Sequence, residues 1–568
     1  MLPIAPTLIA SLSRRTWIAL ALIMAILWFA QLDVRKLQHP DEGRYAEIAR
    51  EMVATGNWVT PRLNGIKYFE KPALQYWLTA ASFEAFGVSD GTARLPTALA
   101  GFLTVVAIGW TGAVLVSPAA GVYAAAVLAS CIWHFGIAHI LTLDALLSFC
   151  LALALVGFLL AQRADASPRS RERMMLLAYV ATAAGILTKG VVALAIPGTT
   201  LLLYSLATRD YGPWKRLHLA KGLPLLLVLT APWFIVVSMR NPEFARFFFI
   251  HEHIQRFLTP ESRRPGPWWY FLPMLVAGLL PWTGVFLWRL KAGWRDATAD
   301  AGGFSWARFC LIWSAFILVF FSISKSKLPS YILPIFPAAA LVLGWQLEVM
   351  SARSLSWLAG LLAATTVVLW GAAMLGYPAL AVRLADAKTP LALYQALGPW
   401  VELGLGIVAV GYVVGWRVMR RGSTAARSTA IAVIALSTML AMQALFRGAD
   451  VFRATRSAAD LVTALENASD PPYDRNAPVF QVRMYDQTLP FYLRRTTTLV
   501  AYRDEMSMGL DIQPELAIPK VADWIVRWKL LPQGYALMSP ETRATLEKEG
   551  VPLRVIASDS RRVLVERR

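Results

Sequence analysis

Residues 17–30, with the sequence WIALALIMAILWFA, form an apolar run that follows Arg14 and Arg15. Together with its neighbours, this run approaches the ~20 apolar residues that a helix needs to cross a bilayer. No cleavage site of small residues follows it, so we expect it to be retained as a first membrane helix rather than removed as a signal peptide. The run therefore predicts a membrane protein.

Similar apolar runs recur along the 568 residues, of which 57% are hydrophobic. This composition excludes an ordinary soluble protein. We expect about thirteen membrane-spanning helices, which start near residues 16, 94, 119, 143, 174, 191, 223, 270, 306, 331, 355, 397 and 428.

Basic residues gather in alternate short loops between these runs. The basic clusters are Arg14–Arg15, Arg163–Arg173, Arg209–Lys221, Arg289–Arg295 and Arg417–Arg427. Lysine and arginine mark the cytoplasmic side of a membrane protein, so the N-terminus is expected in the cytoplasm. The net charge of +19 then faces anionic lipid to a large extent. We therefore expect no nucleic-acid partner.

The same topology places three loops and the C-terminal segment on the outer side. The loops comprise residues 32–95, 241–269 and 324–331. From Gly448 onward the apolar runs stop, and strand-like pieces at 479–482 and 554–557 mix with a helical one at 457–466. The predicted fold is thus a polytopic α-helical membrane domain, residues 1–447, followed by a soluble α/β domain, residues 448–568.

The first outer loop contains two amphipathic segments. In residues 39–52, HPDEGRYAEIAREM, apolar and charged residues alternate as in a helix that lies on a membrane surface, and Pro40 and Asp41 suit its start. A second such segment occupies residues 68–78. Both are expected to be juxtamembrane helices.

Polar side chains are unusually dense around these two segments. They are Asp41, Glu42, Arg44, Tyr45, Tyr68, Glu70 and Lys71. Asp41 and Glu42 could simply cap a helix and complement its dipole, and the remaining charges could be interfacial. Their density on one side of the membrane instead predicts a site for a membrane-borne substrate.

Three long segments follow one another along the chain and identify a family when taken together. They are residues 39–52, GNWVTPRLNGIKYFEKP at 56–72, and SKSKLPSYILPIFPAAA at 324–340. This order resembles the bacterial lipid A aminoarabinose transferases, which are GT-C glycosyltransferases related to protein O-mannosyltransferases. The resemblance covers nearly the whole chain and implies a GT-C membrane fold.

The resemblance also implies a reaction. A pentosyltransferase of this family takes 4-amino-4-deoxy-L-arabinose from undecaprenyl phosphate and transfers it to a lipid A phosphate at the periplasmic face of the bacterial inner membrane, which gives resistance to polymyxin and other cationic antimicrobial peptides. We expect a monomer that contacts membrane lipids. Two alternatives stay open: a GT-C transferase of another sugar, such as mannose, and a lipid flippase.

A polyprenyl-phosphate sugar needs cations around its phosphate, which is also the leaving group. Lys71, Lys189 and Arg256 are the candidates on the outer side, and Tyr331 could donate a hydrogen bond. Tyr45 and Tyr68 of the first loop join this expected donor site. Lys189 could instead be a lysine that reaches from a helix end to the membrane surface.

Other charged residues are candidates for binding the sugar or the acceptor. Lys325 and Lys327 lie on an outer turn, where they bind a head group or anchor the chain at the interface. Asp144 holds an ammonium group or caps a helix. Glu42 completes this set of candidates.

The resemblance places Asp41 in the catalytic position, but its role needs care. In the related mannosyltransferases, the acidic residue after the first span is thought to deprotonate a hydroxyl acceptor. A phosphate acceptor has a second pKa near 6 and is already ionised at neutral pH, so it needs no general base. Asp41 is therefore expected to orient the acceptor or to bind the sugar amine, and it would serve as a base only for an acceptor that has to lose a proton.

A divalent cation such as zinc is a further option. Glu70 and His251 offer oxygen and imidazole ligands on two outer loops that the fold could bring together. The spacing does not decide between a metal site and a loop whose side chains meet water and lipid head groups.

Overall fold

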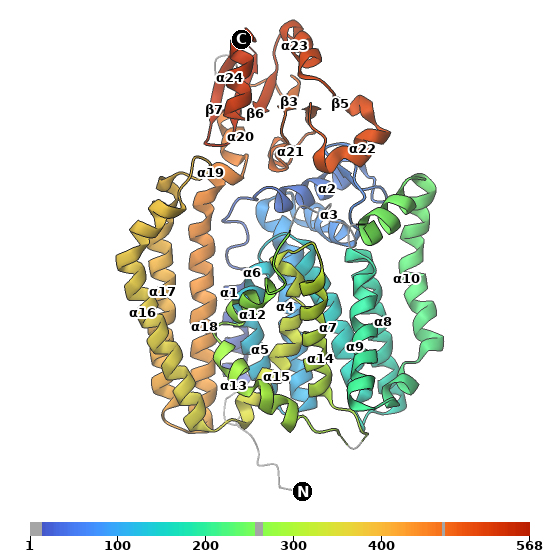
Figure 1. Ribbon diagram of the computed structural model, residues 1–568, viewed down its shortest axis with the longest axis vertical. Helices are drawn as coiled ribbons and strands as arrows, with labels where there is room; N and C mark the ends of the chain where they lie inside the picture. Colours follow the sequence, from blue (N-terminus) through green and yellow to red (C-terminus); the bar gives the residue numbers. More distant parts are fainter. Residues whose placement is uncertain (1–13, 256–264, 301, 469–471, 568) are drawn as a thin grey trace.

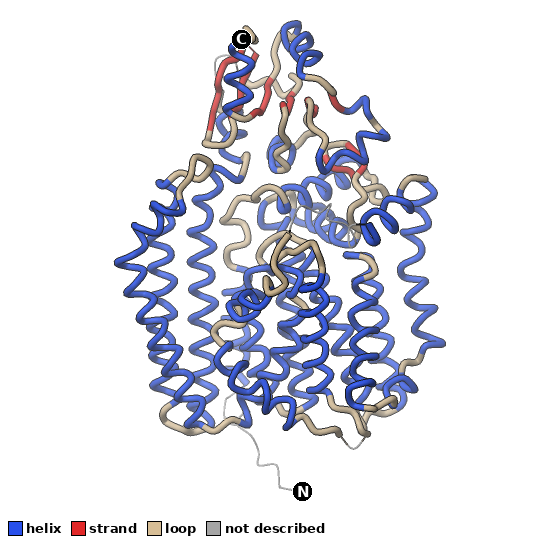
Figure 2. The backbone as a smooth tube through the Cα atoms, in the orientation of Figure 1, coloured by secondary structure: helices blue, strands red, loops and turns tan. Residues whose placement is uncertain are grey.

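The structure is a computed structural model that describes residues 14–255, 265–300, 302–468 and 472–567. A tall bundle of helices forms its lower part, and a small α/β domain at the C-terminus sits on one end of the bundle (Figure 1). The strands lie in that upper part, while the bundle is helical throughout (Figure 2). The fold is therefore a polytopic helical membrane protein with a C-terminal α/β domain, as the sequence predicts.

A helix lies at or near each of the thirteen predicted span positions. These helices are α1 (Arg14–Phe29), α4 (Asp90–Leu115), α5 (Pro118–Ser130), α7 (Leu143–Gln162), α8 (Pro168–Lys189), α9 (Val192–Thr208), α10 (Leu219–Arg240), α12 (Phe271–Gly278), α14 (Trp306–Ile323), α15 (Ile335–Val349), α16 (Ala352–Leu384), α17 (Leu391–Met419) and α18 (Thr424–Ala449). Short helices α6 (Ile132–Ala138) and α13 (Thr283–Asp296) follow α5 and α12 after sharp bends of 63° and 112°.

Seven of the described helices are long and apolar enough to cross a membrane, or up to nine if each bent pair is one span. Two shorter helices, α9 and α15, are also apolar. The chain is thus a multi-pass membrane protein, while the count of thirteen crossings stays a prediction.

Burial separates the centre of the bundle from its periphery. In α7, 89% of the most apolar 18-residue window is buried inside the protein, whereas in α16 the fraction is 17%. A helix that is apolar all round and buried all round belongs to the interior. Helix α7 therefore lies in the interior of the bundle, and α16 lies at its periphery.

The loop that the sequence predicts to be the first outer one folds into α2 (Asp41–Thr55), a two-stranded hairpin of β1 (Arg62–Leu63) and β2 (Ile66–Lys67), and α3 (Leu74–Phe86). Helix α2 begins at Asp41 as predicted, but it does not lie open on a membrane surface. Residues 42–52 are all buried, because the C-terminal domain covers the helix. At Gly43, a Cβ atom would come within 2.8 Å of the backbone of Gln487 and Thr488.

The C-terminal domain is a six-stranded sheet with strand order β5-β4-β3-β6-β8-β7. Its strands are β3 (Val479–Val482), β4 (Thr498–Val500), β5 (Ala517–Ile518), β6 (Tyr535–Met538), β7 (Leu553–Ser558) and β8 (Val563–Arg567). The first four are parallel, and β7 and β8 are antiparallel to their neighbours.

Alternate residues of the central strands face two different apolar cores. Phe480 and Val482 point towards α23 (Val521–Leu530) and α24 (Pro540–Lys548). Val479 packs on the other face with α20 (Ala459–Glu466) and α21 (Thr488–Leu493). This alternation is the two-residue period of a strand.

The domain and the outer loop share one hydrophobic core. Met506 and Leu510 of the domain pack in the same buried cluster as Tyr45, Ile48 and Ile66 of the loop. The C-terminal domain is therefore built onto the loop and is not a separate appendage. Its position fixes α2 above the bundle.

Candidate active site

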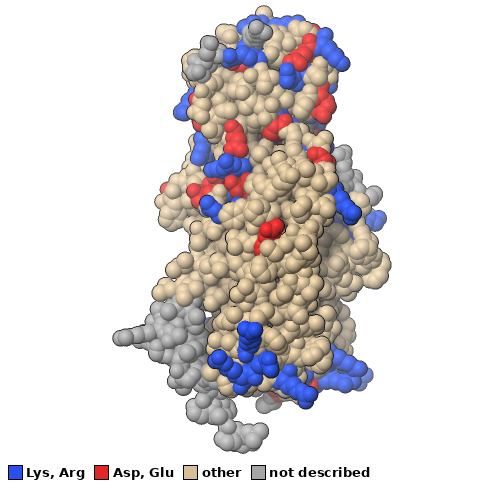
Figure 3. All heavy atoms as spheres, turned by 90° about the vertical axis from the view of Figure 1, so that its left-hand side faces the viewer, with Lys and Arg blue, Asp and Glu red and all other residues tan. Residues whose placement is uncertain are grey.

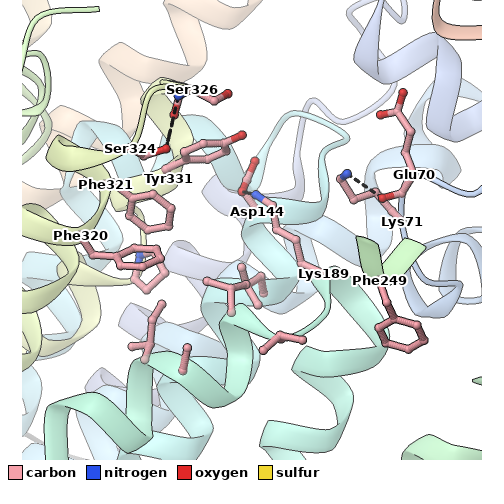
Figure 4. A pocket seen from close by; sticks show the side chains of 16 residues that line it. Glu70, Lys71, Asp144, Lys189, Phe249, Phe320, Phe321, Ser324, Ser326 and Tyr331 are labelled. Atoms are coloured by element: carbon pink, nitrogen blue, oxygen red, sulfur yellow. Dashed lines mark hydrogen bonds and ion pairs between the residues drawn. The ribbon is translucent and has the colours of Figure 1, made fainter. Parts of the chain in front are cut away.

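A cavity of about 640 Å³ lies where the first turn of α7 and the C-terminal ends of α8 and α14 meet the first loop (Figure 4). Its polar lining consists of Glu70, Lys71, Asp144, Lys189, Ser324, Ser326 and Tyr331. A cavity of this size falls in the usual range for ligand pockets. Five of the predicted site residues, from four separate segments, thus line one space.

At the centre of this lining, Lys189 and Asp144 form an ion pair. The ammonium group of Lys189, at the end of α8, donates a hydrogen bond to Oδ1 of Asp144 in the first turn of α7. The other carboxylate oxygen of Asp144 accepts a hydrogen bond from Ser330 Oγ at 2.7 Å. The N-cap position of α7 belongs to Thr142, so Asp144 is a partner of Lys189 and not a helix cap.

Tyr331 adds an aromatic face to this pair. The Lys189 Nζ atom lies 4.5 Å from the centre of the Tyr331 ring, a distance that suits a cation–π contact. Tyr331 lies in the short 3-10 helix η5 (Pro329–Ile332), which follows α14. Lys189 is thus held from two sides and is not a lysine that extends to the membrane surface.

Glu70 and Lys71 bring a second carboxylate and a second ammonium group to the cavity. Lys71 Nζ donates a hydrogen bond of 2.7 Å to the backbone carbonyl of Glu70 (Figure 4). The cavity therefore combines two cations, which can hold a phosphate, with two carboxylates, which can hold an amine.

The other half of the lining is apolar. It includes Leu147, Val192, Phe249, Phe320 and Phe321. Such a surface suits a hydrocarbon chain, because burying it beside another apolar chain removes both from water. The cavity is therefore built for a ligand that has an anionic head and an apolar tail.

Asp41 does not line this cavity. Its side chain is 37% exposed and forms an ion pair of 2.8 Å with Arg44, whose other nitrogen lies 2.7 Å from a carboxylate oxygen of Glu505 in the C-terminal domain. Asp41 thus lies at the contact between loop and domain. Its predicted catalytic role stays a prediction.

Tyr45 and Tyr68 are buried beside Arg44 and also lie outside the cavity lining. Burial raises the pKa of both phenols well above its ordinary value, so both keep their protons at neutral pH. They support Arg44 and the loop around it. Their predicted contact with the donor stays a prediction.

Glu42 has structural contacts, and its predicted role in binding the sugar or the acceptor stays a prediction. It is buried and forms ion pairs with Arg35 at 3.2 Å and Arg94 at 2.7 Å. Burial would raise the pKa of Glu42, but the two guanidinium groups outweigh it and lower the pKa to about 2. Glu42 therefore ties the loop to α4 and has no contact with the cavity.

Lys327 is likewise engaged by its own segment, and its predicted binding role stays a prediction. Its ammonium group donates to the carbonyl oxygens of Ser322 at 2.7 Å and Ser324 at 3.0 Å, and it lies 5.6 Å from the ring centre of Phe271. It therefore satisfies the last carbonyls of α14, a role that suits a lysine at a helix C-terminus. Lys325, on the same turn, is exposed and does not line the cavity.

The side chains of two predicted site residues are outside the described part of the structure. Arg256 and the side chain of His251 lie outside the described residues. Within the described part of the chain, no group of three or more His, Cys, Asp or Glu side chains could hold a metal ion. The cation expected between Glu70 and His251 stays a prediction.

Ser330 and the phenylalanines of the cavity are additions that the sequence analysis did not include. Ser330 directly precedes Tyr331 in the quoted 324–340 segment, so its neighbour was a signal for it. Phe320 and Phe321 end an apolar span and look like ordinary membrane-facing residues in the sequence. Only the fold turns them towards the cavity.

Comparisons with known proteins place this geometry in a family. Residues 466–567 match the model of the aminoarabinose transferase C-terminal domain, and residues 13–248 match that of dolichyl-phosphate-mannose-protein mannosyltransferases. An undecaprenyl phosphate-alpha-4-amino-4-deoxy-L-arabinose arabinosyl transferase from Erwinia tasmaniensis is 32% identical over 407 residues, which are 69% of this chain and 71% of that protein.

The chain belongs to this family. A similarly named protein from Edwardsiella ictaluri is 35% identical, and the matched part is 58% of this chain and 59% of that protein, so the alignment spans less than two thirds of this relative. The solved structure of ArnT from Cupriavidus metallidurans bound to undecaprenyl phosphate is 36% identical, with a TM-score of 0.89 and 98% of both chains covered. These matches confirm the predicted family of aminoarabinose transferases.

The fold is shared more widely than the family. An archaeal oligosaccharyltransferase from Archaeoglobus fulgidus aligns with a TM-score of 0.51 at 11% identity, over 94% of this chain and 70% of that one. This likeness concerns the arrangement of the helices alone. It confirms the predicted GT-C membrane fold of this chain.

Proposed function

We propose that this chain transfers 4-amino-4-deoxy-L-arabinose from undecaprenyl phosphate to a phosphate of lipid A. The observation that carries the proposal is the cavity in which the Lys71 and Lys189 ammonium groups stand beside an apolar wall. That combination matches a carrier with one phosphate and a long hydrocarbon chain. The family relationship supplies the identity of the sugar and the carrier.

In this proposal, the lipid A phosphate oxygen attacks the anomeric carbon of the sugar. The new carbon–oxygen bond forms as the bond between that carbon and the carrier phosphate breaks, and undecaprenyl phosphate leaves with the electron pair. Lys189 and Lys71 stabilise the negative charge that grows on the leaving phosphate. Because the acceptor is already ionised, no residue has to remove a proton from it.

The carboxylates of the cavity have a different role. Glu70 and Asp144 are placed to attract the ammonium group of the aminosugar, and Asp144 also orients Lys189. A neutral hexose has no cation for these groups to hold. This difference favours the aminosugar over mannose as the substrate.

The proposed location is the bacterial inner membrane, with the cavity and the C-terminal domain on the periplasmic side. Positively charged residues at the end of the bundle that points away from the C-terminal domain support this orientation. We also propose that the chain acts as a monomer. Modified lipid A carries fewer net negative charges and binds polymyxin less well.

A divalent cation at Glu70 and His251 is a separate proposal, and no step above passes through it. Among the described residues Glu70 is the only one of the pair whose side chain is placed, and the neighbouring Lys71 disfavours a cation there. Dialysis of the purified protein against EDTA tests the proposal. Loss of transfer that zinc restores supports a cation, and unchanged transfer removes it.

The transfer itself is tested in a bacterial strain that lacks its own aminoarabinose transferase. The chain is expressed there, and lipid A is weighed by mass spectrometry. We expect the mass of one aminoarabinose to be added in the presence of the chain and not with Lys189→Ala. A hexose in its place, or no addition at equal membrane levels of the protein, would overturn the proposal.

A further inference from the structure

A second cavity, of about 780 Å³, opens between α16 and α17 at the end of the bundle that points away from the C-terminal domain (Figure 1). Arg353 and Arg420 line it near the helix ends, and Trp357, Leu361 and Ala364 line it further along α16. The cavity is therefore a groove with a cationic end and an apolar remainder. It is separate from the candidate active site, which is lined by other helices and lies nearer the C-terminal domain.

The groove owes its shape to Gly360. A Cβ atom at this position would come within 2.8 Å of Nε1 of Trp416, so the absence of a side chain lets the indole lie against α16. The ring of Trp416 in turn makes a cation–π contact with Arg420, whose guanidinium carbon is 5.4 Å from the ring centre. The aromatic ring thus places a cation at the end of the groove.

The two arginines that line the groove, Arg353 and Arg420, are not paired with a carboxylate in the described part of the chain. Helix α16 also begins here, and the positive end of its helix dipole adds partial positive charge. Figure 3 faces this side of the bundle and shows Lys and Arg gathered at its lower end below a broad uncharged surface.

The dimensions of the groove match one lipid. From Arg353 to Ala364, the α16 helix rises by ~17 Å, at 1.5 Å per residue. One leaflet of a bilayer has a hydrocarbon thickness of roughly 15 Å, which is half of the whole core. A molecule with its phosphate at the arginines would therefore lay its acyl chain along the apolar wall.

We propose that this groove binds one anionic phospholipid, with the lipid phosphate between Arg353 and Arg420 and an acyl chain along Trp357, Leu361 and Ala364. The lipid comes from the leaflet opposite the C-terminal domain. A zwitterionic lipid fits less well, because its own cation meets the two arginines. The site is independent of the proposed transfer reaction.

Native mass spectrometry of the full chain tests this proposal. The protein is reconstituted in nanodiscs of equal parts phosphatidylglycerol and phosphatidylcholine, released, and its retained lipids are counted. We expect one tightly held phosphatidylglycerol on the wild type, with occupancy at least fivefold lower in the double variant Arg353→Gln and Arg420→Gln. Ala364→Phe fills the apolar wall without changing any charge and is expected to lower occupancy as well.

The matched control removes two arginines from the same end of α17 but outside the groove, by Arg417→Gln and Arg421→Gln. We expect this control to keep the bound lipid. Equal loss in the control would mean that surface charge alone attracts the lipid and would overturn the proposal. Equal retention of phosphatidylcholine, or unchanged occupancy in both groove variants, would overturn it too.

Discussion

Lys189 is the residue on which the candidate active site depends most directly. Its ammonium group is already oriented by Asp144 and Tyr331, so it can meet a phosphate without first losing side-chain freedom. A hydrogen bond to a charged group contributes about 1.5–3 kcal/mol. We therefore expect Lys189→Ala to lower kcat/KM for the carrier-linked sugar by about 10- to 100-fold.

The control for this prediction is Lys221→Ala, which removes an exposed lysine that pairs with Glu172 away from the cavity. It should leave transfer unchanged. Asp144→Asn combined with Lys189→Ala should cost less than the sum of the two single changes, because the two side chains act together. Additive losses, measured by initial rates against donor concentration, would show that the pair does not act as a unit.

Single residues also show the limits of a sequence argument. Asp144, Lys189 and Tyr331 could each be chosen as outer-side polar residues, but their mutual contacts depend on helices that are distant in the chain. Glu42 has the same appearance in the sequence as Asp41, yet it is buried against Arg94. The partner of a charged residue is set by tertiary packing, and the sequence around it contains no signal for that partner.

Glu42→Gln separates a structural role from a catalytic one. Removing this carboxylate leaves Arg35 and Arg94 buried without their partner, which typically costs about 3–5 kcal/mol. We expect a clear fall in the thermal unfolding temperature of the purified protein. Asp41→Asn, on the more exposed neighbour, should leave that temperature nearly unchanged. The reverse order of the two temperatures would contradict the assignment of Glu42.

At the scale of elements, helix α2 carries a buried carboxylate pair beneath the C-terminal domain. Glu51 accepts a hydrogen bond from the backbone N–H of Gly65 at 2.9 Å, and its other oxygen is buried. Burial and the nearby Glu47 raise the pKa of Glu51 from the ordinary 4.5 to about 8. The folded protein therefore holds a proton there that the unfolded chain releases at lower pH.

This shift predicts a pH dependence of stability. Between about pH 4.5 and pH 8 the folded state binds more protons than the unfolded state, so the stability that Glu51 contributes falls as pH rises through this range. Glu51→Gln should remove the decline and raise stability at pH 8 relative to the wild type. Unfolding temperatures from pH 5.5 to 8.5 measure it, with the exposed Glu84→Gln as control. Parallel curves for wild type and Glu51→Gln would rule the effect out.

Element boundaries were easier to predict than element surroundings. The strand at 479–482 appears as predicted, and the pieces at 457–466 and 554–557 correspond to α20 and β7. Helix α2 starts where Pro40 and Asp41 suggest, because local signals set helix starts. Its amphipathic pattern predicts a membrane surface, but an apolar face can equally be covered by protein. Here the C-terminal domain, more than 400 residues further along the chain, covers helix α2.

On the scale of the whole molecule, charge and apolar surface divide the protein into layers. Exposed large apolar side chains are frequent on the bundle, while charged residues occupy its lower end and the C-terminal domain (Figure 3). The sequence alone predicts this layering, because the layering follows from hydropathy and from the distribution of lysine and arginine along the chain. The shared core of loop and domain was not predictable in this way, because it depends on contacts between the two ends of the chain.

The shared core leads to a prediction about how the two ends depend on each other. Gly43 of α2 lies so close to Gln487 and Thr488 that any side chain at this position must push the C-terminal domain away. We expect Gly43→Leu to cost about 1–3 kcal/mol and to speed hydrogen exchange of the α2 amides, because the domain no longer covers them. Gly371→Leu is the matched control, since a Cβ at Gly371 on α16 meets nothing within 4 Å. If the domain is needed to hold the loop over the cavity, transfer to lipid A falls in Gly43→Leu while the protein still inserts in the membrane. Fast exchange in α2 with full transfer activity would instead show that the loop keeps its place above the cavity without the domain.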